Sequence, residues 1–183
     1  MRLLDASEKS LTPVTGDWSP DGKQFAFLMV ETNGKTSLRV VRTSGGGLAQ
    51  KLADSDSETP SWSPDGKWIA YGDSNFGWHL TSADGREHRD LGTIKASNLG
   101  FSRDGKTAYG IRDDDGKLWL FSLDLATANL RDIKQLDNSL RPGSPLNPGY
   151  GTRFSLAPDG KSFAYSVCKQ ESSLWMLQGF AGK

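Results

Sequence analysis

One hexapeptide, Trp18–Lys23 with the sequence Trp-Ser-Pro-Asp-Gly-Lys, constrains the fold of this chain because the chain repeats it. A second copy spans Trp62–Lys67, a weaker third copy spans Phe101–Lys106, and a fourth copy spans Leu156–Lys161. The aspartates of successive copies are 44, 39 and 55 residues apart. A repeat of about 40–45 residues with a turn signature predicts similar units that pack on their neighbours in series.

Each copy predicts a tight turn between two antiparallel strands. Serine suits the first position of a type I turn, proline fixes φ at the second, and aspartate is tolerated at the third. Glycine then takes the left-handed conformation that closes a bulged hairpin. The residues that we assign to these structural turns are Pro20, Asp21, Gly22, Pro64, Asp65, Gly66, Asp104, Gly105, Pro158, Asp159 and Gly160.

The residues after each turn alternate in size, as strand residues do when the two faces of a sheet differ. Large apolar side chains project to one face, and small ones to the other, where the next unit must approach. The large residues are Phe25, Phe27, Ile69, Tyr71, Phe163 and Tyr165, and the small ones are Ala26, Ala70 and Ala164. In the third unit, Gly110 replaces an aromatic residue, so we expect a thinner interface there. Trp18 and Trp62 share one repeat position, and both are expected to be structural.

These patterns predict an all-β fold, a β-propeller of about four four-stranded antiparallel blades. We treat 1–183 as one domain that has clasp strands at 1–12 and blades at 13–53, 54–92, 93–137 and 138–183. The first inner strand ends at Trp18, and the later strands are expected at 24–30, 37–42, 48–52, 58–62, 68–72, 77–82, 87–91, 97–101, 107–112, 117–122, 130–136, 151–155, 162–167 and 173–178.

The two ends of the chain complement each other, because the last blade lacks a fourth strand and residues 1–12 resemble the end of a blade. We therefore expect the N-terminal strand to complete the last blade. Three assemblies stay open at this point. The chain closes alone with four blades, it is a fragment of a larger propeller, or it is a half-propeller that dimerises.

The repeat also carries a resemblance. Residues 62–71, Trp-Ser-Pro-Asp-Gly-Lys-Trp-Ile-Ala-Tyr, resemble the TolB-like (Pro-Asp-Gly, WD-repeat-like) propeller family, over essentially the whole chain. That family includes the periplasmic Tol–Pal propeller, tricorn-type propellers and the propeller domains of prolyl oligopeptidases. Residues 157–166 and 173–179 are similar to C-terminal propellers of bacterial Ser/Thr kinases or winged-helix regulators. The resemblance implies a sensory or scaffolding part of a larger bacterial protein.

Composition narrows the classes of partner. The 22 basic and 22 acidic residues balance, which argues against binding to nucleic acid or to an anionic membrane. No run approaches the roughly 20 apolar residues of a membrane span, so we expect no membrane insertion. Residues 1–5 lack the apolar core of a signal peptide, which leaves the location open. The chain as it stands suggests the cytoplasm, whereas a parent protein could place it in the periplasm.

The sequence does not predict an enzyme. It contains only two histidines, His79 and His88, and no Gly-x-Ser-x-Gly elbow, so we interpret both as strand residues. The hydrolase part that the prolyl oligopeptidase resemblance would require is missing from these residues. The two histidines and the lone Cys168 form no metal-ligand pattern, so no metal or other cofactor is expected.

Three further segments look like turns. Asp113–Gly116 lacks the spaced ligands of a calcium loop and is expected to join two strands of a hairpin. Gly45–Gly47 is not followed by Lys-Ser/Thr, so it is not a phosphate-binding loop. The apolar residues Leu123, Ala126, Leu130 and Ile133 fall at helical spacing. The corresponding segments of the other blades are turns, so we expect a turn at 124–129 as well.

The candidate binding site lies where the loops after second strands and after fourth strands emerge together, on one side of a propeller. Polar and aromatic side chains of both charge signs suit a protein or peptide partner there. The candidate residues are Asn33, Asp56, Asp73, Asn75, Arg112, Asp114, Arg141, Tyr150 and Arg153. The long insertion at 137–151 contains Arg141 and Tyr150 and ends just before Arg153.

We therefore expect a non-enzymatic binding or scaffold module that presents loops to a protein or peptide, with a homodimer as a further option. Two alternatives remain. One is a gating or accessory propeller of a prolyl-oligopeptidase-type enzyme that lacks its catalytic domain. The other is a structural propeller fragment that assembles into a larger ring.

Overall fold

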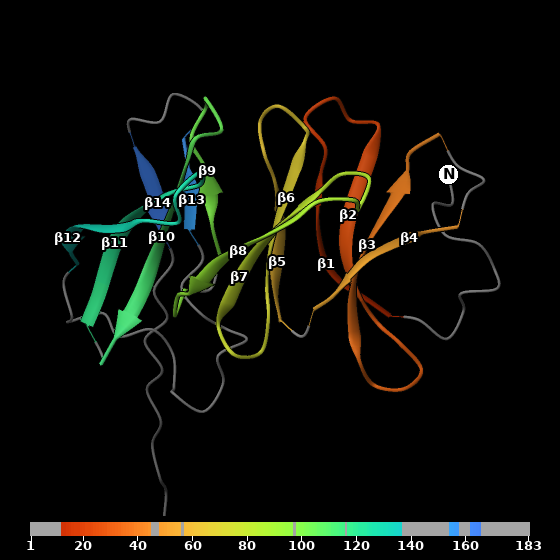
Figure 1. The fold of residues 1–183 in the computed structure, drawn as a ribbon, viewed down its shortest axis with the longest axis horizontal. Helices are drawn as coiled ribbons and strands as arrows, with labels where there is room; N and C mark the ends of the chain where they lie inside the picture. Colours follow the sequence, from red (N-terminus) through yellow and green to blue (C-terminus); the bar gives the residue numbers. More distant parts are fainter. Residues whose placement is uncertain are drawn as a thin grey trace, which may run out of the picture.

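The fold consists of antiparallel β-sheets arranged one after another, as the sequence predicted. The computed structural model describes residues 12–44, 48–55, 57–96, 98–115, 117–136, 154–157 and 162–165, and these residues form four sheets and no helix. Figure 1 shows the first three sheets one after another in chain order, like successive blades of an incomplete propeller, and the two-stranded fourth sheet overlaps the third in this view. The all-β propeller fold is confirmed, whereas the expected clasp at 1–11 and the strand at 173–178 lie outside the described residues.

We number the sheets as blades 1 to 4. Blade 1 contains β1 (Thr12–Trp18), β2 (Gln24–Val30), β3 (Thr36–Arg42) and β4 (Gln50–Asp54). Blade 2 contains β5 (Ser57–Trp62), β6 (Trp68–Gly72), β7 (Gly77–Ser82) and β8 (His88–Thr93). Blade 3 contains β9 (Gly100–Phe101), β10 (Thr107–Asp114), β11 (Lys117–Asp124) and β12 (Leu130–Gln135). Blade 4 shows β13 (Phe154–Leu156) and β14 (Phe163–Tyr165).

In blades 1 to 3, each strand pairs with the next one along the chain. All twelve strands expected there are present, although β9 is shorter than its predicted span. The turn expected at 124–129 is also present, and its backbone N–H groups at Ala126 and Thr127 donate to the Asp124 carboxylate. No described segment forms a helix long and apolar enough to cross a membrane. The blade boundaries themselves stay a prediction.

The repeated turn has the predicted geometry. In blade 1, the Ser19 hydroxyl donates to Asp21 (2.8 Å) and accepts the backbone N–H of Gln24 (2.8 Å). Gly22, Gly66 and Gly105 have φ values of 69°, 68° and 68°, so glycine supplies the left-handed conformation. Blade 3 keeps the turn with Arg103 in place of proline, so the serine, aspartate and glycine suffice. The fourth predicted turn, at 158–160, lies outside the described residues.

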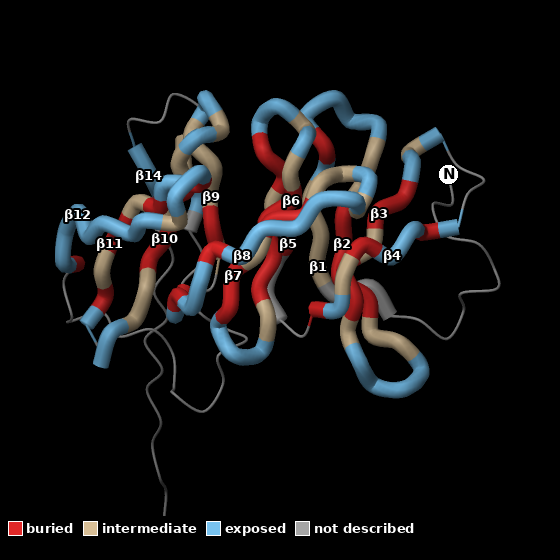
Figure 2. The backbone as a smooth tube through the Cα atoms, viewed as in Figure 1, coloured by how far each residue is buried: buried red, intermediate tan, exposed pale blue. Residues whose placement is uncertain are grey.

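Adjacent blades bury their apolar faces against each other, and Figure 2 shows the buried residues along the middle of the strands. We call the face toward the next blade the forward face and the opposite one the rear face. The forward face of blade 1, which includes Ala26 and Leu38, packs on Trp62, Ile69 and Tyr71 of blade 2. The predicted division into small forward and large rear residues therefore holds in blades 1 and 2.

In blade 3 the small residues lie on the rear face, so the division is reversed, but the interface with blade 2 is not thinner. Gly110 lies on its rear face, and the ring of Phe121 on the paired strand β11 fills the space beside it. A Cβ atom at Gly110 would lie 2.8 Å from the Phe121 ring, which excludes a larger residue there. Phe121 is fully buried against Trp78 and Leu80 of blade 2. The expectation of a thinner interface is therefore wrong, because a neighbouring strand supplies the missing ring.

Trp18 and Trp62 differ, although they share one repeat position. Trp62 is 5% exposed, its backbone N–H donates to the Asp17 carboxylate (2.9 Å), and its indole N–H donates to the Asp17 carbonyl (3.1 Å). Trp18 is 52% exposed, and its ring leans on Phe25 at a centroid distance of 5.0 Å. Trp18 therefore does not pack between two described blades as Trp62 does, although the sequence predicted a structural role for both.

Candidate binding face

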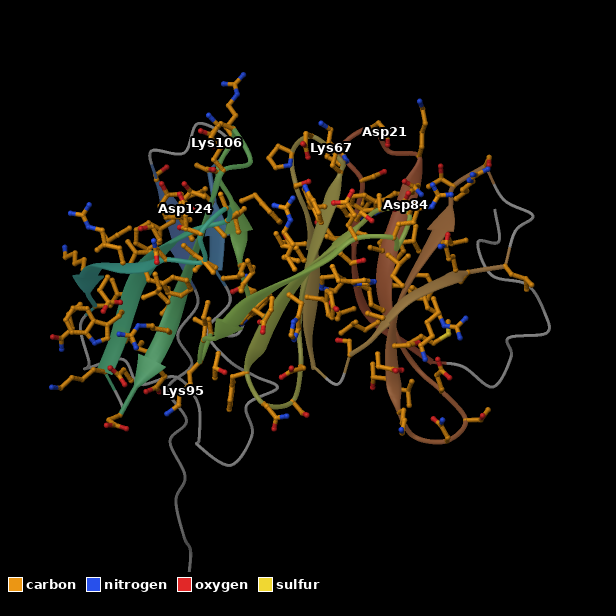
Figure 3. All side chains as sticks on the ribbon, viewed as in Figure 1. Asp21, Lys67, Asp84, Lys95, Lys106 and Asp124 are labelled. Carbon is orange, nitrogen blue, oxygen red and sulfur yellow. The ribbon has the colours of Figure 1, made fainter. Side chains whose placement is uncertain are left out.

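Two opposite sides of the molecule carry different sets of loops. The repeated turns lie along the upper side in Figure 3, where Asp21, Lys67 and Lys106 are labelled, whereas Lys95 lies at the lower side. The lower side gathers the loops that follow β2, β6, β8 and β10. We call this side the loop face, and define it by residues 31–35, 73–76, 94–96 and 114–115.

Blade 2 presents a hydrogen-bonded cluster of ionisable side chains at this face. Asp73 follows β6 and accepts the backbone N–H groups of Asn75 (2.8 Å) and Gly77 (2.9 Å), which fixes the turn. Its second oxygen lies 3.0 Å from Nε2 of His79 on β7, and Asp90 of β8 lies 3.8 Å from Nδ1 of the same ring. The hydrogen bond with His79 is the main reason that the pKa of Asp73 is lowered.

Tyr71 completes this cluster from the buried side. Its ring lies 5.3 Å from the His79 ring and is 7% exposed. Burial raises the pKa of Tyr71, and the nearby charges of Asp73 and Asp90 add to that effect. Tyr71 therefore stays neutral, and its ring lies beside the imidazole.

Blade 1 has a comparable cluster around Glu31, the first residue after β2. Its carboxylate lies 3.2 Å from Arg39 Nη2 on β3 and 3.8 Å from Lys51 Nζ on β4. Lys51 also contacts Asp54 at 2.6 Å. A hydrogen bond from Ser37 is the largest cause of the lowered pKa of Glu31, followed by the one from Arg39.

Blade 3 has the best-defined ion pair. Arg112 on β10 reaches across β11 to Asp132 on β12, with Nε–Oδ1 and Nη2–Oδ2 distances of 3.0 and 2.8 Å. Its Nη1 also lies 3.3 Å from Asp114. Two parallel hydrogen bonds to a carboxylate form the strong, directional geometry that guanidinium groups favour. They are the main cause of the raised pKa of Arg112 and of the lowered pKa of Asp132.

The structure places five of the nine candidate residues. Asn33, Asp73 and Asn75 lie in turns of the loop face, and Arg112 and Asp114 contact each other at the end of β10. The Asn33 side chain accepts the backbone N–H of Lys35 (2.9 Å), so it supports its own turn, as Asp73 does. Their role in binding stays a prediction. The other four candidates, Asp56, Arg141, Tyr150 and Arg153, lie outside the described residues.

Sequence reasoning missed the ion-pair cluster around Glu31 in blade 1, and it did not consider Asp90 or Asp132. It interpreted His79 only as a strand residue. These side chains meet their partners across the sheet, so no local motif marks them. The described part of the chain contains no group of three or more His, Cys, Asp or Glu side chains that could hold a metal ion.

Comparisons with known proteins support the fold. No protein-family model matches the chain. The uncharacterized peptidase YuxL of Bacillus subtilis is 33% identical over 92 residues, which is 49% of this chain but 14% of that protein. A protein assigned as TolB from Agrobacterium tumefaciens matches with a TM-score of 0.61 and 16% identity, over 82% of this chain and 63% of the other.

Two more solved structures agree. TolB from Acinetobacter baumannii matches with a TM-score of 0.54 and 17% identity, over 85% of this chain and 43% of its own. A protein assigned as dipeptidyl aminopeptidase IV from Bacteroides ovatus matches with a TM-score of 0.58 and 13% identity, over 85% of this chain and 25% of that protein. The chain thus spans less than two thirds of each of these proteins. At these identities the likeness shows the fold, which is that of a partial TolB-like β-propeller.

Proposed function

We propose that this partial TolB-like β-propeller is a non-enzymatic module that binds a protein or peptide on its loop face. The supporting observation is that three consecutive blades each hold a cluster of ionisable side chains that reaches that face, through Glu31, Asp73 and Asp114 respectively. The clusters centre on Glu31 with Arg39, Asp73 with His79, and Arg112 with Asp132. Polar groups fixed in advance by the scaffold favour selective docking, because little ordering is needed when the partner arrives.

The mixture of charge signs indicates the kind of partner. Paired acids and bases leave no strong field of one sign, which nucleic acid would require. They suit the polar rim of a protein interface, where complementary charges set the orientation of the partner. The mechanism is presentation of preformed loops, without covalent chemistry.

A peptide-display selection against the whole chain tests this proposal. The selected peptides are then measured by calorimetry against Lys95→Glu, which reverses an exposed charge of the loop face, and Lys67→Glu, which reverses an exposed charge on the opposite side. We expect Lys95→Glu to change the dissociation constant at least tenfold and Lys67→Glu to change it less than twofold. The reverse pattern, or no binding tighter than about 1 mM, would contradict the proposal.

A second candidate is an accessory propeller of a peptidase, favoured by the 33% identity to YuxL over 92 residues. In that case the full-length protein would carry an adjoining hydrolase domain with a nucleophile elbow. Sequencing the coding region on both sides of this segment tests the idea directly. Hydrolysis of fluorogenic peptides by this chain alone would contradict both candidates, because each assigns the chain a non-catalytic role.

A further inference from the structure

The turn that follows β6 in blade 2 holds a phenylalanine in a backbone conformation that favours glycine. Phe76 has a φ of 61°, and 38% of the residue is exposed. Bulky residues rarely adopt this left-handed conformation, because the Cβ atom crowds the backbone. Blade 2 packs on blade 1 and on blade 3, so the exposure of Phe76 does not arise at an end of the row of blades.

The matching turn of blade 1 shows that phenylalanine is not needed to form this turn. Glu31 and Asp73 are each the first residue after the second strand of their blade. The backbone N–H of Gly34 donates to the Glu31 carbonyl (2.9 Å), and that of Phe76 donates to the Asp73 carbonyl (3.1 Å). Gly34 therefore occupies the position of Phe76, with a φ of 78°. Glycine adopts this conformation without strain, whereas Phe76 does not.

Contacts on both sides hold Phe76 in this strained conformation. The Asp73 carboxylate accepts the backbone N–H groups of Asn75 and Gly77, the residues before and after Phe76. The carbonyl of Phe76 accepts the N–H of Ile94 (2.8 Å), which is buried. More than a third of Phe76 nevertheless stays in water, so the fold does not use the whole ring. Strain that the surrounding structure enforces in this way is typical of residues that contact a ligand.

An exposed cation adjoins this aromatic residue. Lys95 follows Ile94 in the chain and lies at the lower side of the molecule in Figure 3. Its carbonyl accepts the backbone N–H of Asp113 (2.9 Å), so its main chain is fixed between blades 2 and 3. Its ammonium group forms no ion pair with a described residue. The loop face therefore offers an aromatic ring and an unpaired positive charge close together.

We propose that Phe76 is the apolar anchor of the loop face, where it packs on an apolar or aromatic side chain of a peptide while Lys95 binds a neighbouring carboxylate. The role of Phe76 rests on the proposed function of the loop face and specifies the partner, a peptide in which an apolar residue stands next to Asp or Glu. Protein interfaces enrich aromatic residues at their centre and polar groups at their rim. Phe76 has this setting, because its blade lies between the polar clusters of blades 1 and 3.

Two selections from one library of random 12-residue peptides test the chemistry of the partner. One selection uses the whole chain, and the other uses the whole chain with Phe76→Gly, which copies the turn of blade 1. We expect the first set of peptides to be enriched in an apolar residue beside Asp or Glu. The second set should lose the apolar enrichment. A first set that is not enriched in apolar residues would overturn the proposal.

Calorimetry with the most enriched peptide of the first set then separates binding from stability. Phe76→Gly should weaken binding at least tenfold, and Phe76→Tyr, which keeps the ring, should weaken it less than threefold. The melting temperature of Phe76→Gly should shift by less than about 4 °C, because relief of strain offsets the lost contacts of the ring. A purely structural phenylalanine would lower the melting temperature without this loss of affinity.

Leu48→Gly is the matched control on the opposite side of the molecule. Leu48 is 71% exposed in the loop after β3, and this loop contacts the repeated turn of blade 1 through a hydrogen bond from Thr43 to the Gly22 carbonyl (3.0 Å). Removal of its side chain should change the dissociation constant less than twofold. An equal loss of affinity in Leu48→Gly and Phe76→Gly would overturn the proposal.

The failure of the anchor can be told apart from the failure of the binding function. A peptide whose affinity falls in Lys95→Glu but not in Phe76→Gly would leave the loop face as the binding site and overturn the role of Phe76. No binding tighter than about 1 mM would contradict the binding function itself, and the anchor with it. If Phe76→Gly melts more than about 4 °C below the unchanged chain, Phe76→Asn replaces it, because asparagine tolerates the left-handed conformation. The same tenfold loss is expected, and unchanged affinity in that variant would overturn the proposal.

Discussion

At the scale of single residues, the serine of each repeat links the two strands of its hairpin. The Ser63 hydroxyl donates to Asp65 (2.7 Å) and accepts the backbone N–H of Trp68 (2.9 Å). Ser63 is almost fully buried, whereas Ser102 makes the same two bonds at a half-buried position in blade 3. The same local chemistry should therefore contribute differently to stability in the two blades.

Ser63→Ala should lower the free energy of unfolding by about 1–2 kcal/mol, because the N–H of Trp68 loses its acceptor in a buried turn. Ser102→Ala is the matched variant and should cost less, because water can replace its hydroxyl. Urea denaturation measures both values. Equal losses at the two sites would show that burial does not set the contribution of this serine.

The two buried tryptophans of blade 2 differ in how their indole N–H is satisfied. The N–H of Trp62 donates to Asp17, whereas the N–H of Trp78 is buried with no acceptor among the described residues. Trp62→Phe removes a hydrogen bond and leaves a carbonyl unpaired, but Trp78→Phe removes an unsatisfied donor. Both lose ring volume, so we expect Trp62→Phe to cost about 1–2 kcal/mol more in unfolding free energy. A larger loss for Trp78→Phe in calorimetric unfolding would contradict this reasoning.

At the scale of elements, side chains tie the outer strand of blade 3 to the strands inside it. Every residue of β12 is exposed, so packing holds this strand only weakly. The bidentate contact from Arg112 to Asp132 spans the intervening strand β11. It gives β12 an attachment that the main-chain ladder does not supply.

Arg112→Lys should reduce hydrogen-exchange protection of β12, because lysine cannot form two parallel bonds to one carboxylate. The half-buried pair should lose about 0.5–1 kcal/mol of local stability. Arg86→Lys is the control, since Arg86 is highly exposed and lies 3.5 Å from Asp84. Exchange measured by mass spectrometry should show a change at β12 for the first variant and little change for the second. Unaltered protection at β12 in Arg112→Lys would mean that the ladder alone holds the strand.

At the scale of the whole molecule, hydrogen-bonded carboxylates couple stability to pH. The pKa values of Asp65, Asp73 and Asp132 are lowered from 3.8, mainly by hydrogen bonds from Ser63, His79 and Arg112 respectively. Each group then binds its proton less readily in the folded state than in the unfolded chain. Its contribution is complete above the unfolded pKa and is lost as the pH falls through the folded one.

The melting temperature should therefore fall as the pH drops below about 4, with no comparable loss between pH 5 and 7. Asp65→Asn keeps an acceptor oxygen but cannot titrate, so its melting temperature should depend less steeply on pH in the acidic range. Calorimetric scans of both proteins from pH 2 to 7 measure the slopes. Parallel slopes would show that the turn aspartate does not contribute to acid sensitivity.

The sequence by itself determined the elements and their order, because each depends on residues close together in the chain. The alternation after each Asp-Gly-Lys and the left-handed glycines at Gly22, Gly66 and Gly105 specify hairpins without help from distant segments. The same local logic predicted the turn at 124–129 against a helical spacing of apolar residues. It also placed Asp73 and Asn75 on one side of the molecule with Arg112.

Only the tertiary structure decided which repeated positions are equivalent in space. Trp18 and Trp62 begin identical hexapeptides, but only Trp62 has a preceding blade among the described residues to pack against. The contact of His79 with Asp73, like that of Arg112 with Asp132, depends on strand register. A shift of one residue in register turns every side chain to the other face, and no local motif reports such pairing. Packing between blades and register within them are long-range properties, which is why the candidate site emerged from the sequence only in part.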